Sequence, residues 1–311
     1  MKKTLVYLAS APRSGSTLLT NLLGNCPEFF NIGEIHNLSD FLNEGRQGKY
    51  FDGKCACGEK VRSCSKWSKI IRKVVLTLGL VSDKELSTRC SNDLVKFRWR
   101  CLPRSNMAKK IRQRVQCDQE MARVAKHNFC LMEAAMEVTG AKLIINSSKN
   151  PPTLACYLCH KPDDWNIKVI HLARDPRATA LSMIKGAVKA GLRPKSYYRY
   201  LLGILNRRRV TKCLTSMLRP ENVLDLTLEE ICRSPEQSMR QLLDFLKKPS
   251  RQSLYTEKVN QRHDIGGSVG VSGVVGIKDI KLDQTWKKQM TLSMNLFYRV
   301  AQAFFKNQHK Y

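Results

Sequence analysis

A short loop near the N-terminus carries the residues best suited to hold a phosphate. It reads Ala11-Pro-Arg-Ser-Gly-Ser-Thr17 and contains a single cation, Arg13. An apolar run over residues 4–10 precedes the loop and has the β-branched and aromatic residues of a buried strand. Leucines at helical spacing over residues 18–23 follow it. A strand, loop and helix in this order aim backbone N–H groups and a helix N-terminus at one point, which suits a phosphate.

The loop departs from the P-loop that binds ATP or GTP at two positions. That motif reads GxxxxGK followed by Ser or Thr, and its lysine contacts the β- and γ-phosphates. Gly15 and Thr17 fall in register with it, but Ser10 replaces the first glycine and Ser16 replaces the lysine. The loop is therefore a poor site for a triphosphate. It suits a single phosphate that carries a transferable anionic group.

A second arginine and serine follow another predicted strand. The strand over residues 166–173 ends at Arg174, and Pro176 begins a helix that contains Ser182. An arginine at a strand end and a serine one to two turns into the next helix can converge on one phosphate, the first through its planar fork of donors and the second through its hydroxyl. Two such motifs in one chain are far more specific than either alone.

At these two motifs the chain resembles the sulfotransferase family, whose 5′-phosphosulfate loop reads PRSGST or PKSGTT. The resemblance implies that 3′-phosphoadenosine 5′-phosphosulfate (PAPS) is the co-substrate. It also implies that Arg174 and Ser182 hold the 3′-phosphate of PAPS. The residues that it implies for the 5′-phosphosulfate are Arg13, Ser14, Gly15, Ser16 and Thr17. Residues 50–140 carry no usable match.

Three charged residues are candidates for catalysis. Sulfuryl transfer is an in-line displacement that places negative charge on the leaving phosphate and the sulfuryl oxygens, so cations should stabilise it. Arg13 and Lys149, which follows the second predicted strand, would supply that charge. Tyrosylprotein sulfotransferases use a glutamate in a Gly-Glu pair after the first helix as the base, and Gly33-Glu34 matches it. The resemblance therefore implies Glu34 as the general base.

Histidines offer the alternative to Glu34. Small-molecule sulfotransferases place a histidine shortly after the lysine at the second strand, but Asn150-Pro151-Pro152 occupies that place here. His36 is the competing base because it lies close to Glu34 in the sequence. His171 falls within a predicted strand, which favours a packing role.

Periodicity along the rest of the chain predicts an α/β fold. Apolar strands over residues 142–148, 166–173 and 223–226 alternate with helices, which favours a parallel sheet with right-handed crossovers. Helical patterns over residues 65–80 and 106–139 lie between the first two predicted strands. We expect one domain over residues 1–311, with a P-loop-like parallel sheet flanked by helices and a variable, mostly helical insertion over about residues 50–140. A final amphipathic helix is predicted over residues 286–305.

Two further stretches are less specific. The chain has 12 cysteines, but its one dense cluster, Cys55-Ala-Cys57 with Cys64, lacks a fourth zinc ligand and the usual CxxC spacing. The spacing favours a local disulfide or plain burial, and we expect no metal. A glycine-rich loop over residues 263–276 has the flexibility of a flap over a ligand, and an ordinary surface loop is an equal alternative.

The charge balance favours anionic partners. The chain has 54 basic and 26 acidic side chains, a net charge of +28, which suits nucleic acid, acidic polysaccharide, a membrane surface or a phosphorylated cofactor. No apolar run approaches the ~20 residues of a membrane span, and the first strand starts too early to leave room for a signal peptide. We expect a cytoplasmic chain, or the trimmed catalytic part of a lumenal enzyme.

The sequence therefore predicts a PAPS-dependent sulfotransferase that needs no metal and acts on an acceptor hydroxyl. The basic surface and the missing histidine favour a carbohydrate or another anionic acceptor over a small phenol. A tyrosylprotein-type sulfotransferase and a kinase with a degenerate P-loop are alternatives within enzymes. A non-specific nucleic-acid or polyanion-binding protein is the alternative from another class, although the chain lacks basic residues interleaved with aromatic ones. Oligomeric state is not predicted.

Overall fold

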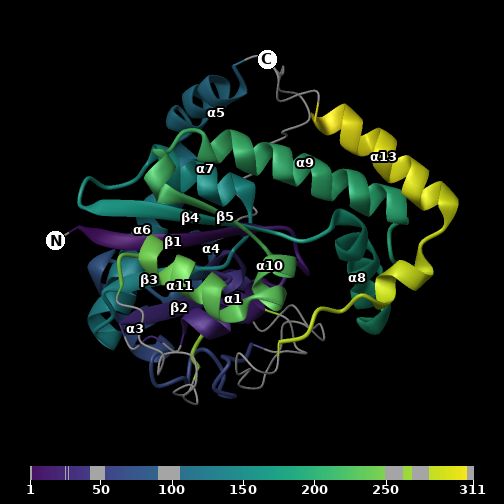
Figure 1. Cartoon of the computed structure of the whole chain (residues 1–311). Coiled ribbons are helices and arrows are strands. Elements are labelled where there is room, and N and C mark those ends of the chain that lie inside the picture. The colour runs from purple at the N-terminus through teal and green to yellow at the C-terminus, as the bar shows by residue number, and fades with distance from the viewer. Residues whose placement is uncertain are drawn as a thin grey trace.

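The structure is a computed structural model that describes residues 2–24, 26, 28–42, 53–89, 106–248, 262–267 and 280–306. Five parallel strands form one sheet in the order β2-β3-β1-β4-β5 (Figure 1). The strands are β1 (Lys3–Ser10), β2 (Phe29–Gly33), β3 (Leu143–Asn146), β4 (Trp165–Ala173) and β5 (Val223–Thr227). The predicted α/β fold with a helix-flanked parallel sheet is confirmed.

Both faces of the sheet are covered by apolar clusters. The side chains of β1 alternate between the two faces and join both clusters. Leu5 and Tyr7 join one buried cluster, whereas Val6 and Leu8 join another. A strand buried on both faces reads as a continuous apolar run, as this one does. In Figure 1, α7 and α9 lie on one side of the sheet and α1, α10 and α11 on the other.

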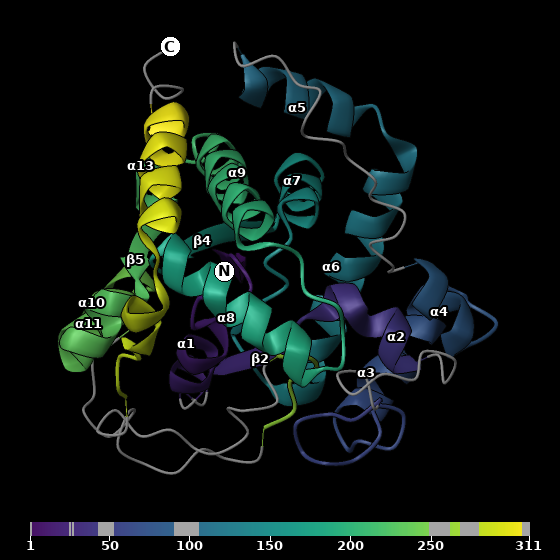
Figure 2. The same cartoon turned by 90° about the vertical axis from the view of Figure 1, so that its right-hand side faces the viewer.

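The helices fill the connections between the strands. In Figure 2, α3 to α6 gather on one side of the molecule, and α13 runs alongside α9 on the other. The α-helices are α1 (Ser16–Leu23), α2 (Leu38–Leu42), α3 (Trp67–Thr77), α4 (Asp83–Arg89), α5 (Met107–Gln116), α6 (Gln119–Thr139), α7 (Pro151–Cys159), α8 (Pro176–Lys189), α9 (Tyr197–Thr215), α10 (Leu228–Arg233), α11 (Pro235–Phe245) and α13 (Leu292–Lys306). Three 3-10 helices are η1 (Ile35–Asn37), η4 (Pro220–Asn222) and η6 (Thr285–Gln289). In the part of the chain that the structure describes, no helix has the length and apolar character needed to cross a bilayer.

Strand β2 was not predicted. It is a short edge strand whose sequence, Phe29-Phe-Asn-Ile-Gly33, includes two residues of low strand propensity. Pairing with β3 sets its conformation, with Phe29 opposite Leu143 and Phe30 opposite Ile144. A contact with residues that come more than a hundred positions later therefore decides the local structure.

Two predicted helical stretches are each divided. The stretch over residues 106–139 was expected to be one long helix, but α5 ends at Gln116 and α6 begins at Gln119. Asp118 separates them, because its side chain accepts a hydrogen bond of 3.0 Å from the backbone N–H of Met121 and so caps α6. The predicted final helix is divided in the same way into η6 and α13, with Met290 extended between them.

Candidate active site

The predicted phosphate loop lies at the carboxyl end of the central strand β1 and enters α1. Arg13 and Gly15 both have left-handed backbone conformations, with φ of 66° and 88°. The left-handed φ favours glycine at position 15, and a Cβ atom there would lie 2.5 Å from Leu228 Cδ1 on α10. No side chain caps α1, and its first turn has no acidic residue. The helix N-terminus therefore favours an anion at this point.

The two predicted phosphate motifs meet, because β1 and β4 are neighbours in the sheet. Arg13 Nε donates a hydrogen bond of 3.4 Å to Ser182 Oγ, and Arg174 Nη1 donates one of 3.1 Å to the Arg13 carbonyl. The Nε of Arg174 is buried and has no partner among the described residues. A buried donor without an acceptor is costly, and a bound anion would supply the acceptor. We call Arg13–Thr17, Arg174 and Ser182 the arginine end of the site.

A cavity of about 560 Å³ adjoins the arginine end. Arg174, Asp175, Arg177, Trp286 and Tyr298 are among the residues that line it. Asp175 caps α8 and pairs with Arg177 at 2.7 Å. The guanidinium of Arg177 lies 5.0 Å from the Trp286 ring centre and 4.7 Å from that of Tyr298. The cavity has the volume and the mixed lining of a small-molecule site.

Glu34 and Lys149 form an ion pair on the other side of β1. Each follows one of two paired strands, Glu34 after β2 and Lys149 after β3. Lys149 Nζ donates to Glu34 Oε1, and the two side chains are only 11% and 16% exposed, respectively. Asn37 Nδ2 donates to the second carboxylate oxygen at 3.4 Å. We call Glu34 and Lys149 the carboxylate end of the site.

Arg13 and Lys149, the two residues predicted to supply positive charge in catalysis, share an unusual backbone conformation. Arg13 and Lys149 are two of four described non-glycine residues with positive φ, and Lys149 has a φ of 61°. A left-handed conformation is costly for a side chain of this size and persists where the surroundings hold it. For Lys149 the surroundings include Arg207, which donates a hydrogen bond of 2.7 Å to its carbonyl. No sequence motif pointed to Arg207.

The two histidines occupy different environments. Burial lowers the pKa of His36 to about 4, although Glu34 acts in the opposite direction. Its Nδ1 is buried and has no partner among the described residues. His171 lies within the sheet, and its Nδ1 is 2.7 Å from an oxygen of Asp225 on β5, in keeping with the predicted packing role. A neutral His36 with so low a pKa is a weak base at neutral pH.

Residues 262–267, which we call the crossing segment, connect the two ends. The backbone N–H of Glu34 donates to the Ile265 carbonyl at 2.7 Å, and Gly33 forms a parallel bridge with Ile265. Cβ atoms built on Gly266 and Gly267 would lie 2.9 Å from Glu34 Cβ and 3.5 Å from Thr17 Oγ1. The segment therefore packs against Glu34 and against the start of α1.

The sequence predicted that residues 263–276 form either a flap over a ligand or an ordinary surface loop. Of this stretch, residues 263–267 are described, and the rest lies outside the described residues. Asp264 and Ile265 are buried, so this part is not an ordinary surface loop. The role of the segment was missed because no spacing in the sequence relates it to Gly33 or Glu34.

Comparison with known proteins gives one family. A family model described as "Sulfotransferase family" matches residues 6–251. Two similar solved structures are a sulfotransferase domain from the curacin biosynthetic pathway and one from the Synechococcus PCC 7002 olefin synthase. The first has 18% identity, covers 98% of each chain and has a TM-score of 0.54. The second has 19% identity, covers 97% of this chain and 94% of the other, and has a TM-score of 0.52. No curated protein sequence matches the chain.

Proposed function

Because the chain belongs to the sulfotransferase family, we propose that it moves a sulfuryl group from PAPS to a hydroxyl of a carbohydrate acceptor. The family match confirms the resemblance that the two phosphate motifs carried. The observation that supports PAPS as the donor is the convergence of Arg13, Arg174 and Ser182 at neighbouring strand ends. A 3′-phosphate and a 5′-phosphosulfate are two separate anions, and the two motifs offer a site for each.

In this proposal the arginine end binds the nucleotide. The 5′-phosphosulfate lies at the N-terminus of α1, where the backbone N–H groups of the Ser14–Thr17 stretch and the guanidinium of Arg13 offset its charge. The 3′-phosphate accepts hydrogen bonds from Arg174 and Ser182. The buried Arg174 Nε that lacks a partner among the described residues supports this assignment. The 560 Å³ cavity beside Arg174 gives the nucleoside a place.

The carboxylate end then performs the transfer. Glu34 accepts the proton of the acceptor hydroxyl as that oxygen forms its bond to sulfur. The bond between sulfur and the 5′-phosphate oxygen breaks in the same displacement, and the electron pair stays on the phosphate. Arg13 stabilises the charge that develops on the leaving phosphate, and Lys149 that on the sulfuryl oxygens. Lys149 also holds the carboxylate of Glu34 in place before the acceptor arrives.

The charge of the protein supports an anionic carbohydrate as the acceptor. The net charge is +28, and the partly buried Arg207 adds a cation beside Lys149. A field of this sign attracts an acidic glycan more strongly than a neutral phenol. A tyrosine in a peptide would use the same glutamate base, so the acceptor must be identified by its product.

An acceptor screen with sulfur-labelled PAPS tests the proposal. The screen presents acidic and neutral glycans, a tyrosine peptide and a small phenol at equal hydroxyl concentration. We expect label on a glycan and much less on the peptide or the phenol. Label on the peptide alone would contradict a carbohydrate acceptor but would still support sulfuryl transfer from PAPS. Label on none of them, with phosphate transferred from ATP instead, would favour the kinase.

Nucleotide binding tests the donor separately. 3′-Phosphoadenosine 5′-phosphate should raise the melting temperature, because it binds only the folded chain. At a concentration one hundred times its Kd, it should increase the free energy of unfolding by about 2.7 kcal/mol. ATP with magnesium should raise it much less at the same concentration. Equal stabilisation by both nucleotides would contradict PAPS as the donor. Salt-sensitive binding of DNA of any sequence, with no nucleotide effect, would favour the nucleic-acid alternative.

A further inference from the structure

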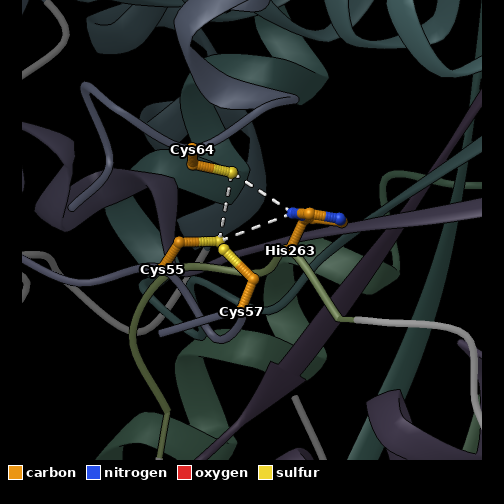
Figure 3. Close-up of side chains that lie close together, drawn as sticks. All are labelled: Cys55, Cys57, Cys64 and His263. Carbon is orange, nitrogen blue, oxygen red and sulfur yellow. Dashed lines mark hydrogen bonds between the residues drawn. The ribbon is translucent and has the colours of Figure 1, made fainter. Parts of the chain in front are cut away.

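Three cysteines and one histidine converge beside the crossing segment. The ligand atoms of Cys55, Cys57, Cys64 and His263 all lie within 4.8 Å of one another (Figure 3). Cys64 Sγ is 3.2 Å from His263 Nδ1 and 3.7 Å from Cys55 Sγ, and Cys55 Sγ is 4.0 Å from the same nitrogen. The three cysteines are free thiols. The histidine is the fourth ligand that the sequence spacing lacked.

The three distances among Cys55, Cys64 and His263 are close to those of a tetrahedral zinc site. With Zn–S bonds of about 2.3 Å and Zn–N bonds of about 2.0–2.1 Å, the edges of the tetrahedron are about 3.8 Å between sulfurs and about 3.5 Å between sulfur and nitrogen. The three measured distances lie within about 0.5 Å of these edges. We propose that Cys55, Cys57, Cys64 and His263 bind one zinc ion, in place of the disulfide or plain burial favoured by the sequence.

The chemistry of the four ligands selects zinc and a structural role. Three soft thiolates with one imidazole form a Cys₃His set, which suits zinc better than magnesium or calcium. Four protein ligands leave no open position for water or substrate, and closed sites of this kind are structural. The ion is therefore proposed as an anchor rather than as part of the sulfuryl transfer.

The backbone around the cysteines holds them in place before a metal binds. Cys55 N–H donates to the Glu59 carbonyl at 2.8 Å, and Gly58 N–H closes a turn onto the Cys55 carbonyl at 2.9 Å. Gly58 has a φ of 94°, a conformation that this tight turn needs. Cys64 comes shortly before α3, and its N–H donates to the Lys60 carbonyl at 2.8 Å. A preformed site lowers the conformational entropy lost on binding.

The backbone next to His263 is held as well. Trp67 Nε1 donates a hydrogen bond of 2.5 Å to the His263 carbonyl, and Ala56 N–H donates one of 3.0 Å to the Asp264 carbonyl. Asp264 in turn pairs with Arg262 at 2.7 Å. Hydrogen bonds next to a metal ligand help to hold it in its binding orientation. The crossing segment thus meets residues 53–67 through both its backbone and its proposed metal ligand.

One consequence reaches the carboxylate end. Two residues after His263, the carbonyl of Ile265 accepts the backbone N–H of Glu34. Gly266 then packs against the Glu34 side chain. Zinc would therefore hold the crossing segment where it positions Glu34. This consequence rests on the proposed function of Glu34, whereas the metal site does not.

Metal analysis of the full chain tests the site. Protein expressed with added zinc and purified under reducing conditions without chelator should contain one zinc per chain by mass spectrometry. Cobalt in its place should give thiolate charge-transfer bands and the visible bands of a tetrahedral centre. Cys64→Ser and His263→Ala should lose the metal. Cys130 is a half-buried thiol on α6 outside the cluster, and Cys130→Ser should keep the zinc. His263→Cys should also keep the zinc, through a fourth thiolate.

Several outcomes would overturn the proposal. These are a parent protein with almost no metal, full zinc retention in both ligand variants, a different metal at the same stoichiometry, and a disulfide within the cluster in the reduced preparation. If the variants do not fold, zinc release from the parent protein by a thiol reagent gives the same test, since the zinc should leave as the cluster thiols react. Metal content is independent of transfer activity. Zinc without sulfuryl transfer would reject the proposed function alone, and transfer without zinc would reject the metal site alone.

Discussion

The two ends of the site reach their geometry in different ways. At the arginine end, two contiguous motifs each follow a strand, and the pairing of β1 with β4 brings them together. At the carboxylate end, Glu34 follows an edge strand and is held by the crossing segment, which comes much later in the chain. A local motif carries its own geometry, whereas a contact between distant segments must overcome loop-closure entropy. The carboxylate end should therefore be the more sensitive to changes outside itself.

The two ends also differ in charge. Arg13 and Arg174 lie together at the arginine end, and the buried Nε of Arg174 has no partner among the described residues. At the carboxylate end the charges of Glu34 and Lys149 already offset one another. The arginine end thus carries the positive charge of two arginines, whereas at the carboxylate end the charges of Glu34 and Lys149 cancel and Arg207 beside them adds a cation. Removing one member of a buried pair leaves the other charge uncompensated, so single substitutions there need a stability control.

The largest effect should follow substitution of the proposed base. Glu34→Gln keeps the size and polarity of the side chain but cannot accept the proton, so turnover should fall by ~10²–10⁴-fold. Affinity for 3′-phosphoadenosine 5′-phosphate should remain near normal, because the proposed site of that nucleotide is the arginine end. Steady-state rates with labelled PAPS and nucleotide titration measure the two quantities.

His36→Gln is the matched control for Glu34→Gln, and it should reduce turnover much less. Thermal melts of both variants show whether loss of the Lys149 partner has unfolded the site. Normal turnover in Glu34→Gln together with inactivity in His36→Gln would identify the histidine as the base.

The next effect should come from closing the space between β2 and the crossing segment. A Cβ atom at Gly33, which has a φ of 74°, would lie 2.1 Å from the Ile265 carbonyl oxygen. Gly33→Ala should displace the segment and reduce stability by about 1–3 kcal/mol or more, with a parallel loss of turnover. Denaturant unfolding and activity assays measure these changes.

Gly140→Ala separates the clash from the backbone strain. Gly140 has nearly the same φ, 73°, but an added Cβ there would meet no atom within 4 Å. It should therefore lose only the part of the stability that any alanine loses in a left-handed conformation. Equal losses in the two variants would show that contact with the crossing segment contributes nothing.

A smaller effect should mark the 3′-phosphate contact. Arg174→Ala should weaken the binding of 3′-phosphoadenosine 5′-phosphate by about 1.5–3 kcal/mol, because a charge-assisted hydrogen bond is lost. Affinity for adenosine 5′-phosphosulfate, which lacks the 3′-phosphate, should hardly change. Calorimetric titration of both nucleotides gives the comparison. Arg219→Ala removes an arginine that is 84% exposed and should alter neither affinity, whereas equal losses for both nucleotides in Arg174→Ala would refute a 3′-specific role.

The same contrast explains what the sequence could predict. The sequence predicted Arg13, Arg174 and Ser182 as phosphate ligands because each lies where a strand leads through a short loop into a helix. In the structure these residues lie together. Asp118 also had the residue type of a helix cap, yet the continuous helical pattern on both sides hid the break between α5 and α6. Local rules therefore predicted the two phosphate motifs and most of the sheet.

The parts that were missed depend on contacts between distant residues. Strand β2 exists through its pairing with β3, and two of its five residues, Asn31 and Gly33, have low strand propensity. The fourth ligand of the cysteine cluster, His263, lies 199 residues from Cys64, so no spacing rule for zinc ligands could include it. Glu34 was predicted as the base from its Gly-Glu pair, but its place after β2, the ion pair with Lys149 and the contact with Ile265 required the folded structure.

The last effect concerns pH and again distinguishes the carboxylate end. Burial lowers the pKa of His36 to about 4, with Lys149 and Arg207 acting in the same direction and Glu34 against them. The unfolded chain should have a histidine pKa of about 6.5. Between these values the unfolded chain binds more protons, so stability rises with pH. The contribution is fully present above about pH 6.5 and is lost as the pH falls toward 4, by about 2 kcal/mol between pH 7 and pH 5.

Urea unfolding at several pH values measures this slope in the parent and in His36→Gln. Because glutamine does not titrate, the variant should lose less stability over the same range, and the difference between the two proteins is the contribution of His36. His171 is the matched control, since its ring is buried and lies against Asp225 on the sheet. His171→Gln should keep the part of the slope that His36 supplies. Equal slopes in the parent and His36→Gln would show that His36 is not held neutral, and its low basicity would no longer argue for Glu34 as the base.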